Sequence, residues 1–330
     1  MARKKDTAAP PPADVPLPRS GRGGDHSRSE WWGEGSLAVR GVLRTHEPLA
    51  RHTSWRVGGP ADRYFEPADR ADLVVFARQL PSGEPVLWLG LGSNLLVRDG
   101  GFRGTVIALH GALDNLSRDS ETTISAEAGV HCARLAKFAE RQNLAGLGFM
   151  AGIPGTVGGA LAMNAGAWGG ETWNAVLEAE VIFRDGRTGW LGAEHFGISY
   201  RTVIPPREFL GFLGARLRVG PDDGSHARVT RESLAKRKAT QPVGKPSAGS
   251  TFRNPPGDHA ARLIESCGLK NHRIGGAHVS ALHANFILTD DGACAADVEQ
   301  LIQVIRETVR QQTGVELEPE VKVVGEAADA

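Results

Sequence analysis

Glycine clusters are the feature of this sequence that most directly suggests chemistry. Nine of the 25 residues from Gly146 to Gly170 are glycine, and smaller clusters occur at residues 90–94 and 58–60. A backbone without Cβ atoms can approach a ligand closely, adopt positive φ and present N–H groups to phosphate oxygens. The clusters therefore predict a site for a phosphate-bearing ligand. On spacing alone, glycines at β-turns and in tight packing remain the alternative.

Two familiar phosphate motifs do not account for these clusters. Gly90-x-Gly92 has Leu95 where the dinucleotide-binding pattern G-x-G-x-x-G needs its third glycine, and no obvious helix follows. Residues 155–159 read Gly-Thr-Val-Gly-Gly and lack the Lys-Ser/Thr pair that ends a P-loop. Neither a Rossmann turn nor P-loop NTPase chemistry is indicated.

The elements that must position these loops are mainly strands in the first two thirds of the chain. Short apolar runs predict strands at residues 86–89, 105–109, 179–183, 188–191 and 209–219. Apolar residues at helical spacing predict one helix over residues 131–142, packed on a sheet. The regular strand–helix alternation of a doubly wound fold is absent.

The last third of the chain has a different character. A Pro/Gly/Ser-rich passage at residues 241–250 precedes a short helix near residues 259–267 and an extended segment at residues 284–289. A long helix follows, with apolar residues at helical spacing from Val298 to Val309 and Gly314 as its stop. We place a domain boundary near residue 220.

Composition excludes several classes of protein. The 330 residues include 38 Lys plus Arg and 38 Asp plus Glu, so no global basic field is available for nucleic acid or an anionic membrane. No apolar run approaches the ~18 residues that a membrane span needs. Cys132, Cys267 and Cys294 show no C-x-x-C pairing, so neither a zinc site nor a disulfide framework is indicated, and a reducing, cytoplasmic setting is expected. Residues 1–36 are rich in Pro, Arg and Gly and are predicted to be a disordered tail.

Several motifs in one order give the chain a strong resemblance to a known family. They are His52 to Asp62, Gly90 to Leu96, Gly152 to Ala160 with Met163 to Gly166, Tyr200-Arg201, Ala248 to Pro255, Gly268 to Lys270, Gly275 to Ala277 and Leu317 to Val321. Together they resemble the UDP-N-acetylenolpyruvoylglucosamine reductases, the MurB family, from about residue 42 to 325. Each motif is weak by itself, and their common order makes coincidence implausible.

The resemblance implies a fold and a division of the chain. The fold class is α+β, with an FAD-binding domain of the para-cresol methylhydroxylase type at residues 37–219, in two α+β subdomains of about 37–110 and 111–219. A C-terminal α+β substrate-binding domain is expected at residues 220–326, which agrees with the boundary near residue 220.

The resemblance also implies a reaction. Members of the family reduce UDP-N-acetyl-3-O-(1-carboxyvinyl)glucosamine to UDP-N-acetylmuramate, a peptidoglycan precursor, as UDP-N-acetylmuramate dehydrogenases. Hydride passes from NADPH to FAD and then from flavin N5 to the enolpyruvyl double bond. An isolated alkene accepts hydride poorly, so negative charge must be stabilised as it spreads into the carboxylate.

Three residues match the family's catalytic positions. Arg201 is the expected cation, Ser250 the proton donor, and Glu320 a partner of Arg201 that is expected to have a raised pKa and to be protonated. Without the resemblance, Arg201 reads as a surface or ion-pair residue and Ser250 as a turn residue, and Glu318 competes with Glu320.

The same resemblance assigns binding residues. It implies dissociable, non-covalent FAD and an anionic UDP-sugar as ligands, with NADPH as co-substrate, no metal, no nucleic acid and no membrane, and we expect a monomer. The cofactor-binding matches are Gly90, Gly92, Ser93, Asn94, Gly155, Thr156, Gly158, Gly159 and Asn164, and the substrate-binding matches are Arg253 and Asn254.

The sequence departs from the family pattern at a few positions. Val203 stands where a serine is often found, and Arg253 where lysine is common. The chain has no tyrosine between Arg201 and Ser250, which places it in the shorter class of the family, without the tyrosine loop that clamps the diphosphate. The remaining candidates for that clamp are Lys236, Arg237, Lys238 and Gln241, with His283 as a further substrate contact.

Two other functions stay open from the sequence. A flavin oxidase of the same fold would share the glycine clusters, but it would not need the Gly-Ser-Thr-Phe-Arg-Asn-Pro and Leu-Glu-Pro-Glu motifs. A non-catalytic nucleotide-sugar binder would not need Arg201, Ser250 and Glu320, all of which are present.

Overall fold

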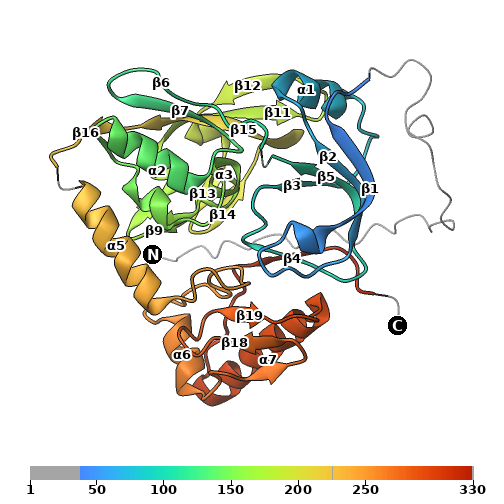
Figure 1. Ribbon diagram of the computed structural model, residues 1–330, viewed down its shortest axis with the longest axis vertical. Helices are drawn as coiled ribbons and strands as arrows, with labels where there is room; N and C mark the ends of the chain where they lie inside the picture. Colours follow the sequence, from blue (N-terminus) through green and yellow to red (C-terminus); the bar gives the residue numbers. More distant parts are fainter. Residues whose placement is uncertain (1–37, 110, 225, 329–330) are drawn as a thin grey trace, which may run out of the picture. The chain divides into compact units, whose positions relative to one another are not determined.

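The computed structural model describes residues 38–109, 111–224 and 226–328 (Figure 1). The predicted N-terminal tail, residues 1–36, lies outside these residues. Within them, no helix has an apolar stretch long enough to cross a membrane.

The first part of the described chain is built on a four-stranded mixed sheet. Its strands, in the order β1-β2-β5-β3, are β1 (Val42–Pro48), β2 (Pro60–Glu66), β5 (Phe102–Ala108) and β3 (Val86–Leu89). β1 runs antiparallel to β2, whereas β2 and β3 each pair with β5 in parallel. The strands predicted at residues 86–89 and 105–109 are confirmed as β3 and β5.

The helix α1 (Arg70–Arg78), which connects β2 to β3, was not predicted. It begins at Asp69, whose carboxylate accepts a hydrogen bond from the backbone N–H of Asp72 at 2.9 Å. Such an N-cap satisfies one of the unpaired N–H groups of the first helical turn. Leu73, Phe76 and Ala77 form its buried face.

A five-stranded antiparallel sheet forms the middle of the chain. In the order β12-β11-β15-β7-β6, its strands are β12 (Thr188–Leu191), β11 (Val176–Phe183), β15 (Phe209–Arg218), β7 (Thr123–Glu127) and β6 (Leu116–Arg118). The three strands predicted between residues 179 and 219 are confirmed, and so is the preceding helix, α2 (Cys132–Arg141). One apolar core joins this sheet to α2.

Short elements between α2 and β15 carry the loops of interest. They are β8 (Leu144–Ala145), η2 (Gly148–Gly152), α3 (Val157–Met163), β9 (Gly166–Ala167), β10 (Gly170–Glu171), α4 (Thr172–Ala175), η3 (Ala193–His195), β13 (Gly197–Ser199) and β14 (Thr202–Ile204). β13 and β14 form a hairpin whose two-residue turn is Tyr200-Arg201. The helix α3 inside the glycine-rich run was not predicted.

The C-terminal part combines a small antiparallel sheet with three helices. The sheet order is β17-β18-β19, with β17 (Arg273–Ile274), β18 (Ala277–Val279) and β19 (Ile287–Thr289), and the helices are α5 (His226–Thr240), α6 (Ala260–Ser266) and α7 (Ala295–Thr313). The predictions of α6 and of the long helix, α7, are confirmed. The extended segment predicted at residues 284–289 is wrong over its first half, because Phe286 N–H closes a turn on the carbonyl of His283 and only Ile287–Thr289 is a strand. α5 was missed because its charged sequence has no clear apolar stripe.

Contacts between distant segments bring residues 320–324 next to the glycine loop at residues 90–94. β20 (Lys322–Val324) pairs in parallel with β4 (Leu95–Val97), which follows residues 90–94 directly. The indole Nε1 of Trp55 donates to the carbonyl of Ile287 at 2.8 Å, and Trp55 and Leu96 belong to the same apolar core as α6 and α7. This packing places Glu320 beside Asn94.

Candidate active site

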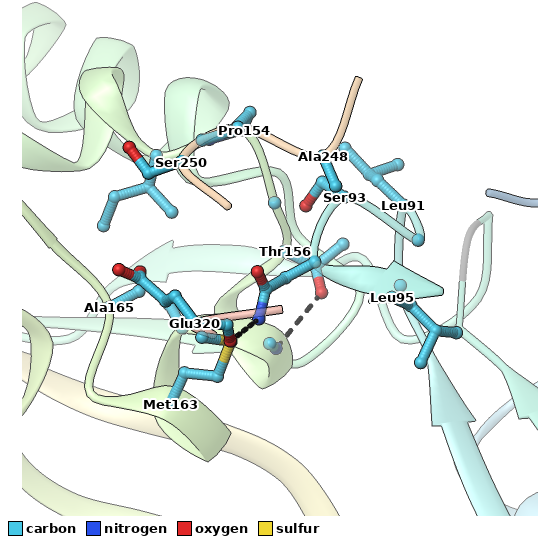
Figure 2. Close-up of a pocket in the computed structure, with 18 of the residues that line it drawn as sticks. Leu91, Ser93, Leu95, Pro154, Thr156, Met163, Ala165, Ala248, Ser250 and Glu320 are labelled. Carbon is cyan, nitrogen blue, oxygen red and sulfur yellow. Dashed lines mark hydrogen bonds between the residues drawn. The ribbon is translucent and has the colours of Figure 1, made fainter. Parts of the chain in front are cut away.

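One cavity of about 530 Å³ gathers most of the residues singled out by the sequence. Figure 2 shows Ser250, Glu320, Thr156 and Ser93 around it. The predicted site residues that line it are Gly90, Gly92, Ser93, Asn94, Gly155, Thr156, Gly159, Arg201, Ser250 and Glu320. Gly158, Asn164, Arg253 and Asn254 do not line it.

In the glycine loop at residues 90–94, two glycines lie so close to neighbouring segments that a Cβ atom would clash. A Cβ on Gly90 would lie 2.5 Å from the hydroxyl oxygen of Thr156, and a Cβ on Gly92 would lie 2.2 Å from the carbonyl oxygen of His52. Gly92 also has a φ of +59°, which glycine adopts without strain. Both glycines are therefore required by the close approach of other segments to this loop.

The glycine loops at residues 90–94 (the first loop) and 155–159 (the second loop) differ in the partners of their backbone N–H groups. In the second loop, the N–H groups of Gly155, Val157 and Gly158 donate to the carbonyls of Ile153, Val130 and Ala128. In residues 90–94, by contrast, no N–H group donates to a backbone carbonyl of the described residues. The first loop therefore retains donors for an anionic ligand, whereas much of the second is committed to the fold.

Arg201 reaches the cavity from the tip of the β13–β14 hairpin. Its Nη2 donates to the carbonyl of Gly166 at 2.9 Å, and its Nε lies 3.1 Å from a carboxylate oxygen of Glu320, although this Nε makes no well-aligned hydrogen bond. The side chains of Arg201 and Glu320 are 17% and 15% exposed, so the pair is largely shielded from solvent. The guanidinium keeps donor capacity toward the cavity that it lines.

Glu320 carries a perturbed carboxyl group. Burial raises its pKa above the usual range for glutamate, while the neighbouring charges of Arg201 and Arg253 act to lower that pKa. The pKa of Glu320 is therefore raised, which is the predicted direction. Its backbone is held on both sides, because its N–H donates to Thr251 at 2.8 Å and its carbonyl accepts from the side-chain amide of Asn94 at 3.0 Å.

Ser250 and Glu320 lie on two segments that are joined by a short strand-like contact. Phe252 and Pro319 form an antiparallel bridge, and the hydrogen bond between Thr251 and Glu320 extends it. These contacts hold the two segments together, and both Ser250 and Glu320 line the cavity. The predicted catalytic residues are thus brought together from three separate parts of the sequence.

Asn164 lies behind the cavity and joins the end of α3 to β10, β13 and α4. It ends α3 in a left-handed conformation, its amide donates to Glu171 and to the carbonyl of Ser199, and its side-chain oxygen accepts from the N–H of Trp173. Because these contacts use both ends of the side chain, Asn164 supports the hairpin that carries Arg201.

The two predicted substrate contacts also lie outside the cavity lining. Arg253 donates to the carbonyl of Arg201, and Asn254 accepts a hydrogen bond from the backbone N–H of Ala260 at the start of α6. Their contact with substrate stays a prediction.

Of the predicted candidates for a diphosphate clamp or a further substrate contact, two line the cavity and three do not. Arg237 and Gln241 line the cavity, and Arg237 donates to the carbonyl of Gly152 at 2.7 Å and to the side chain of Gln241 at 3.0 Å. Lys236 and Lys238 are exposed on α5 and do not line the cavity, and neither does His283.

Comparisons with known proteins agree with this site. Residues 241–324 match the family model described as "UDP-N-acetylenolpyruvoylglucosamine reductase, C-terminal domain", and residues 61–192 match "FAD binding domain". Proteins named UDP-N-acetylenolpyruvoylglucosamine reductase from Nitrosococcus oceani and Methylococcus capsulatus are 55% and 54% identical, over 90% and 87% of this chain and 99% and 95% of theirs. The chain belongs to the UDP-N-acetylenolpyruvoylglucosamine reductase family.

A solved structure of this family supports the fold. The crystal structure of the reductase (MurB) from Thermus caldophilus has a TM-score of 0.73 and 34% identity, and the match covers 87% of this chain and 99% of that one. The expected α+β fold with an FAD-binding part of the para-cresol methylhydroxylase type is confirmed.

The site residues fit the FAD that a reductase of this family requires. Both glycine loops fall within the segment that matches an FAD-binding domain. The uncommitted N–H groups of residues 90–94 and the hydroxyls of Ser93 and Thr156 suit a diphosphate, and Ile153, Pro154 and Met163 add apolar lining.

Sequence reasoning missed two notable residues of the cavity. Lys322 lines it two positions after Glu320, on the same face of an extended segment, and this spacing of two was a usable signal. Trp168 lines it from the β9–β10 turn and is 42% exposed, and nothing in the local pattern separates it from an ordinary turn residue.

Proposed function

We propose that this chain reduces UDP-N-acetyl-3-O-(1-carboxyvinyl)glucosamine to UDP-N-acetylmuramate with bound FAD and with NADPH as the reductant, in peptidoglycan precursor synthesis. The observation that carries the proposal is the convergence of Arg201, Ser250 and Glu320 on the cavity lined by the glycine loops. Membership of the reductase family supports the same reaction.

When bound, non-covalent FAD supplies the hydride for the reduction, having received it from NADPH. In this proposal the backbone of residues 90–94 holds its diphosphate, with Ser93 and Thr156 as additional donors. The second loop contributes mainly shape, since Gly155 and Gly158 use their N–H groups inside the fold.

Arg201 orients the substrate and stabilises charge. Reduction of the enolpyruvyl double bond places negative charge next to the substrate's carboxylate, and a planar guanidinium can hold that carboxylate with two parallel hydrogen bonds. Because Gly166 and Glu320 already fix the Arg201 side chain, little reorganisation is needed as the charge develops.

Ser250 and Glu320 complete the reaction in the proposed mechanism. Ser250 donates a proton to the substrate carbon next to the carboxylate, which is basic enough to accept one from a hydroxyl held at hydrogen-bond distance. Glu320 has a raised pKa, and in its protonated form it acts with Arg201 as a hydrogen-bond donor to the developing enolate.

Three cavity residues are proposed to hold the UDP diphosphate. Arg237 and Lys322 bring positive charge, and Gln241 buttresses Arg237. This set replaces the tyrosine loop of the longer class of the family.

We also propose the division of the chain expected from its sequence. A FAD-binding part spans residues 37–219, with subdomains of about 37–110 and 111–219, and a substrate-binding part spans residues 220–326. Three apolar cores, each centred on one of these segments, support it, and Trp55, Val57 and Leu96 of the first segment also pack in the C-terminal core. We further propose a monomer in a reducing, cytoplasmic setting, which the free thiols of Cys132, Cys267 and Cys294 support.

The test is NADPH oxidation by the purified, FAD-loaded protein with and without the enolpyruvyl UDP-sugar. The proposal expects oxidation to depend on the UDP-sugar and to yield UDP-N-acetylmuramate. A flavin oxidase would show no such dependence, and a non-catalytic binder would bind the UDP-sugar without turnover. Protein that cannot be reconstituted with FAD would contradict both enzyme functions.

A further inference from the structure

Arg253 contacts the backbone of Arg201 although 52 positions separate them in the sequence. Its Nη2 lies 3.3 Å from the carbonyl oxygen of Arg201 and 3.3 Å from the hydroxyl of Thr202, and it donates to both. Arg253 does not line the cavity. Its guanidinium is therefore directed at the β13–β14 hairpin.

The hairpin needs such a support at this point. Arg201 has a φ of +56°, in the left-handed region that non-glycine residues adopt at a cost in free energy. Tyr200, the other turn residue, is 49% exposed, so packing on its side chain does little to fix the turn. Contacts to the backbone carbonyl of Arg201 act directly on the strained residue.

The other end of Arg253 is anchored to the segment that carries Glu320. Its backbone N–H donates to the carbonyl of Glu318 at 2.9 Å, within the contact that also joins Thr251 to Glu320. Ser250 lies three positions before Arg253 in the same segment. One residue thus connects the hairpin of Arg201 to the two segments that hold Ser250 and Glu320.

We propose that Arg253 is a positioning residue. It holds the hairpin so that the Arg201 guanidinium keeps its place relative to Ser250 and Glu320, and it does not touch the substrate. This inference rests on the reductase function proposed above. It gives Arg253 a role different from the substrate contact that the family resemblance implies.

The geometry predicts which substitution preserves this role. Both acceptors, on Arg201 and Thr202, are reached by a single nitrogen of Arg253. A lysine ammonium has three donors on one nitrogen and can donate to both once the side chain or the hairpin shifts to make up for a stem that is one bond shorter, whereas methionine can donate to neither.

The experiment compares Arg253→Met, Arg253→Lys and Thr202→Val with the wild type. Arg262→Met, which removes an exposed arginine of α6 that pairs with Asp258, is the matched control. For each FAD-loaded protein, the rate of flavin reduction by NADPH is measured separately from kcat and KM with the enolpyruvyl UDP-sugar.

We expect Arg253→Met to lower kcat about 10- to 100-fold, since a displacement of about 1 Å can cost that much. KM for the UDP-sugar and the rate of flavin reduction should stay close to the wild type, and Arg253→Lys should restore most of kcat. Thr202→Val should lower kcat by less than Arg253→Met, and it remains informative if Arg253→Met does not fold. The control should behave as the wild type.

Other results would overturn the inference. A rise in KM at constant kcat would indicate direct substrate contact, and an equal loss in both half-reactions would indicate a general structural role. Wild-type kcat in a folded Arg253→Met would also overturn it, as would wild-type kcat in Thr202→Val where Arg253→Met fails to fold. A wild-type protein that does not reduce the UDP-sugar would instead refute the proposed function.

Discussion

The two sides of the cavity are built in different ways. The proposed cofactor side, residues 90–94 and 155–159, offers mainly backbone, and its geometry depends on the absence of Cβ atoms at Gly90 and Gly92. The proposed catalytic side, defined by Arg201, Ser250 and Glu320, offers side chains from three distant segments. Backbone donors can hold a cofactor without any charged residue, whereas the reaction needs groups that carry charge or a proton.

This difference predicts two classes of variant. Substitutions on the cofactor side should weaken FAD binding and thereby impair both half-reactions. Substitutions on the catalytic side should leave flavin reduction by NADPH intact and impair only reduction of the UDP-sugar. Measuring the two half-reactions separately therefore tests whether the two sides of the cavity have these different roles.

Ser250→Ala is expected to have the largest effect. Removing a positioned general acid typically costs about 10²- to 10⁴-fold in rate, so kcat for the UDP-sugar should fall by that amount while NADPH still reduces the flavin. Stopped-flow measurement of the two half-reactions provides the test. Ser266→Ala, which removes a hydroxyl on α6 that donates to Leu263, is the control and should keep wild-type rates. Equal loss of both half-reactions in Ser250→Ala would remove the proton donor from the mechanism.

Arg201→Met should come next in size. Loss of one donor to a developing oxyanion costs about 10²- to 10³-fold in kcat, and the same split between half-reactions is expected. The substitution also removes a charge that lowers the pKa of Glu320. Arg187→Met, at an arginine that is 74% exposed, controls for the general loss of a cation. A variant that reduces the UDP-sugar at the wild-type rate would show that charge is stabilised elsewhere.

Only part of the fold and of the candidate site could be predicted from the sequence. Periodicity located α2 and α7, because their apolar residues recur at helical spacing, but α5 has no such stripe. The proposed catalytic residues were identified through the family's motifs, since an isolated serine such as Ser250 looks like a turn residue. The contact of Arg253 with Arg201 could not be predicted, because it depends on a left-handed turn and on packing between distant segments.

The same limit applies to the glycine loops. From the sequence, residues 90–94 and 155–159 were equivalent candidates for binding phosphate. Which N–H groups stay available is decided by neighbouring carbonyls, such as that of Ala128, which accepts from Gly158. Local sequence contains no signal of that tertiary contact.

On the cofactor side, Gly92→Ala is expected to weaken FAD binding. The substitution adds a Cβ that would lie 2.2 Å from the carbonyl oxygen of His52 and forces alanine to a φ of +59°. Strain of this kind costs about 1–3 kcal/mol. If the FAD-bound conformation of the loop carries all of this strain, the affinity for FAD falls roughly 5- to 150-fold. Titration of the apoprotein with FAD measures it.

Gly83→Ala is the matched control for Gly92→Ala. Gly83 also has positive φ, at +80°, but a Cβ added there would have no neighbouring atom within 4 Å among the described residues. It should reproduce the backbone strain without changing FAD affinity. Equal FAD affinities for the two variants would contradict the importance of the close approach at Gly92.

The smallest expected effect concerns the pH dependence of stability at Glu320. Burial raises the pKa of this carboxyl in the folded protein, so the folded state binds its proton more tightly than the unfolded state. The free energy of unfolding should therefore decrease as pH rises from the unfolded pKa of glutamate, about 4.3, to the higher folded pKa, and then level off. Below that window the carboxyl is protonated in both states and contributes nothing to the pH dependence.

Glu320→Gln removes the titration and so isolates it. Relative to this variant, the wild type should lose stability through the window, as measured by urea unfolding at a series of pH values. Glu318→Gln, two residues away and with a side chain that is 76% exposed in the wild type, is the control. If the wild type lost stability to the same extent relative to both variants, burial would not be the cause. If the wild type instead gained stability as pH rises, the ion pair with Arg201 would outweigh burial, and a protonated Glu320 would have no place in the mechanism.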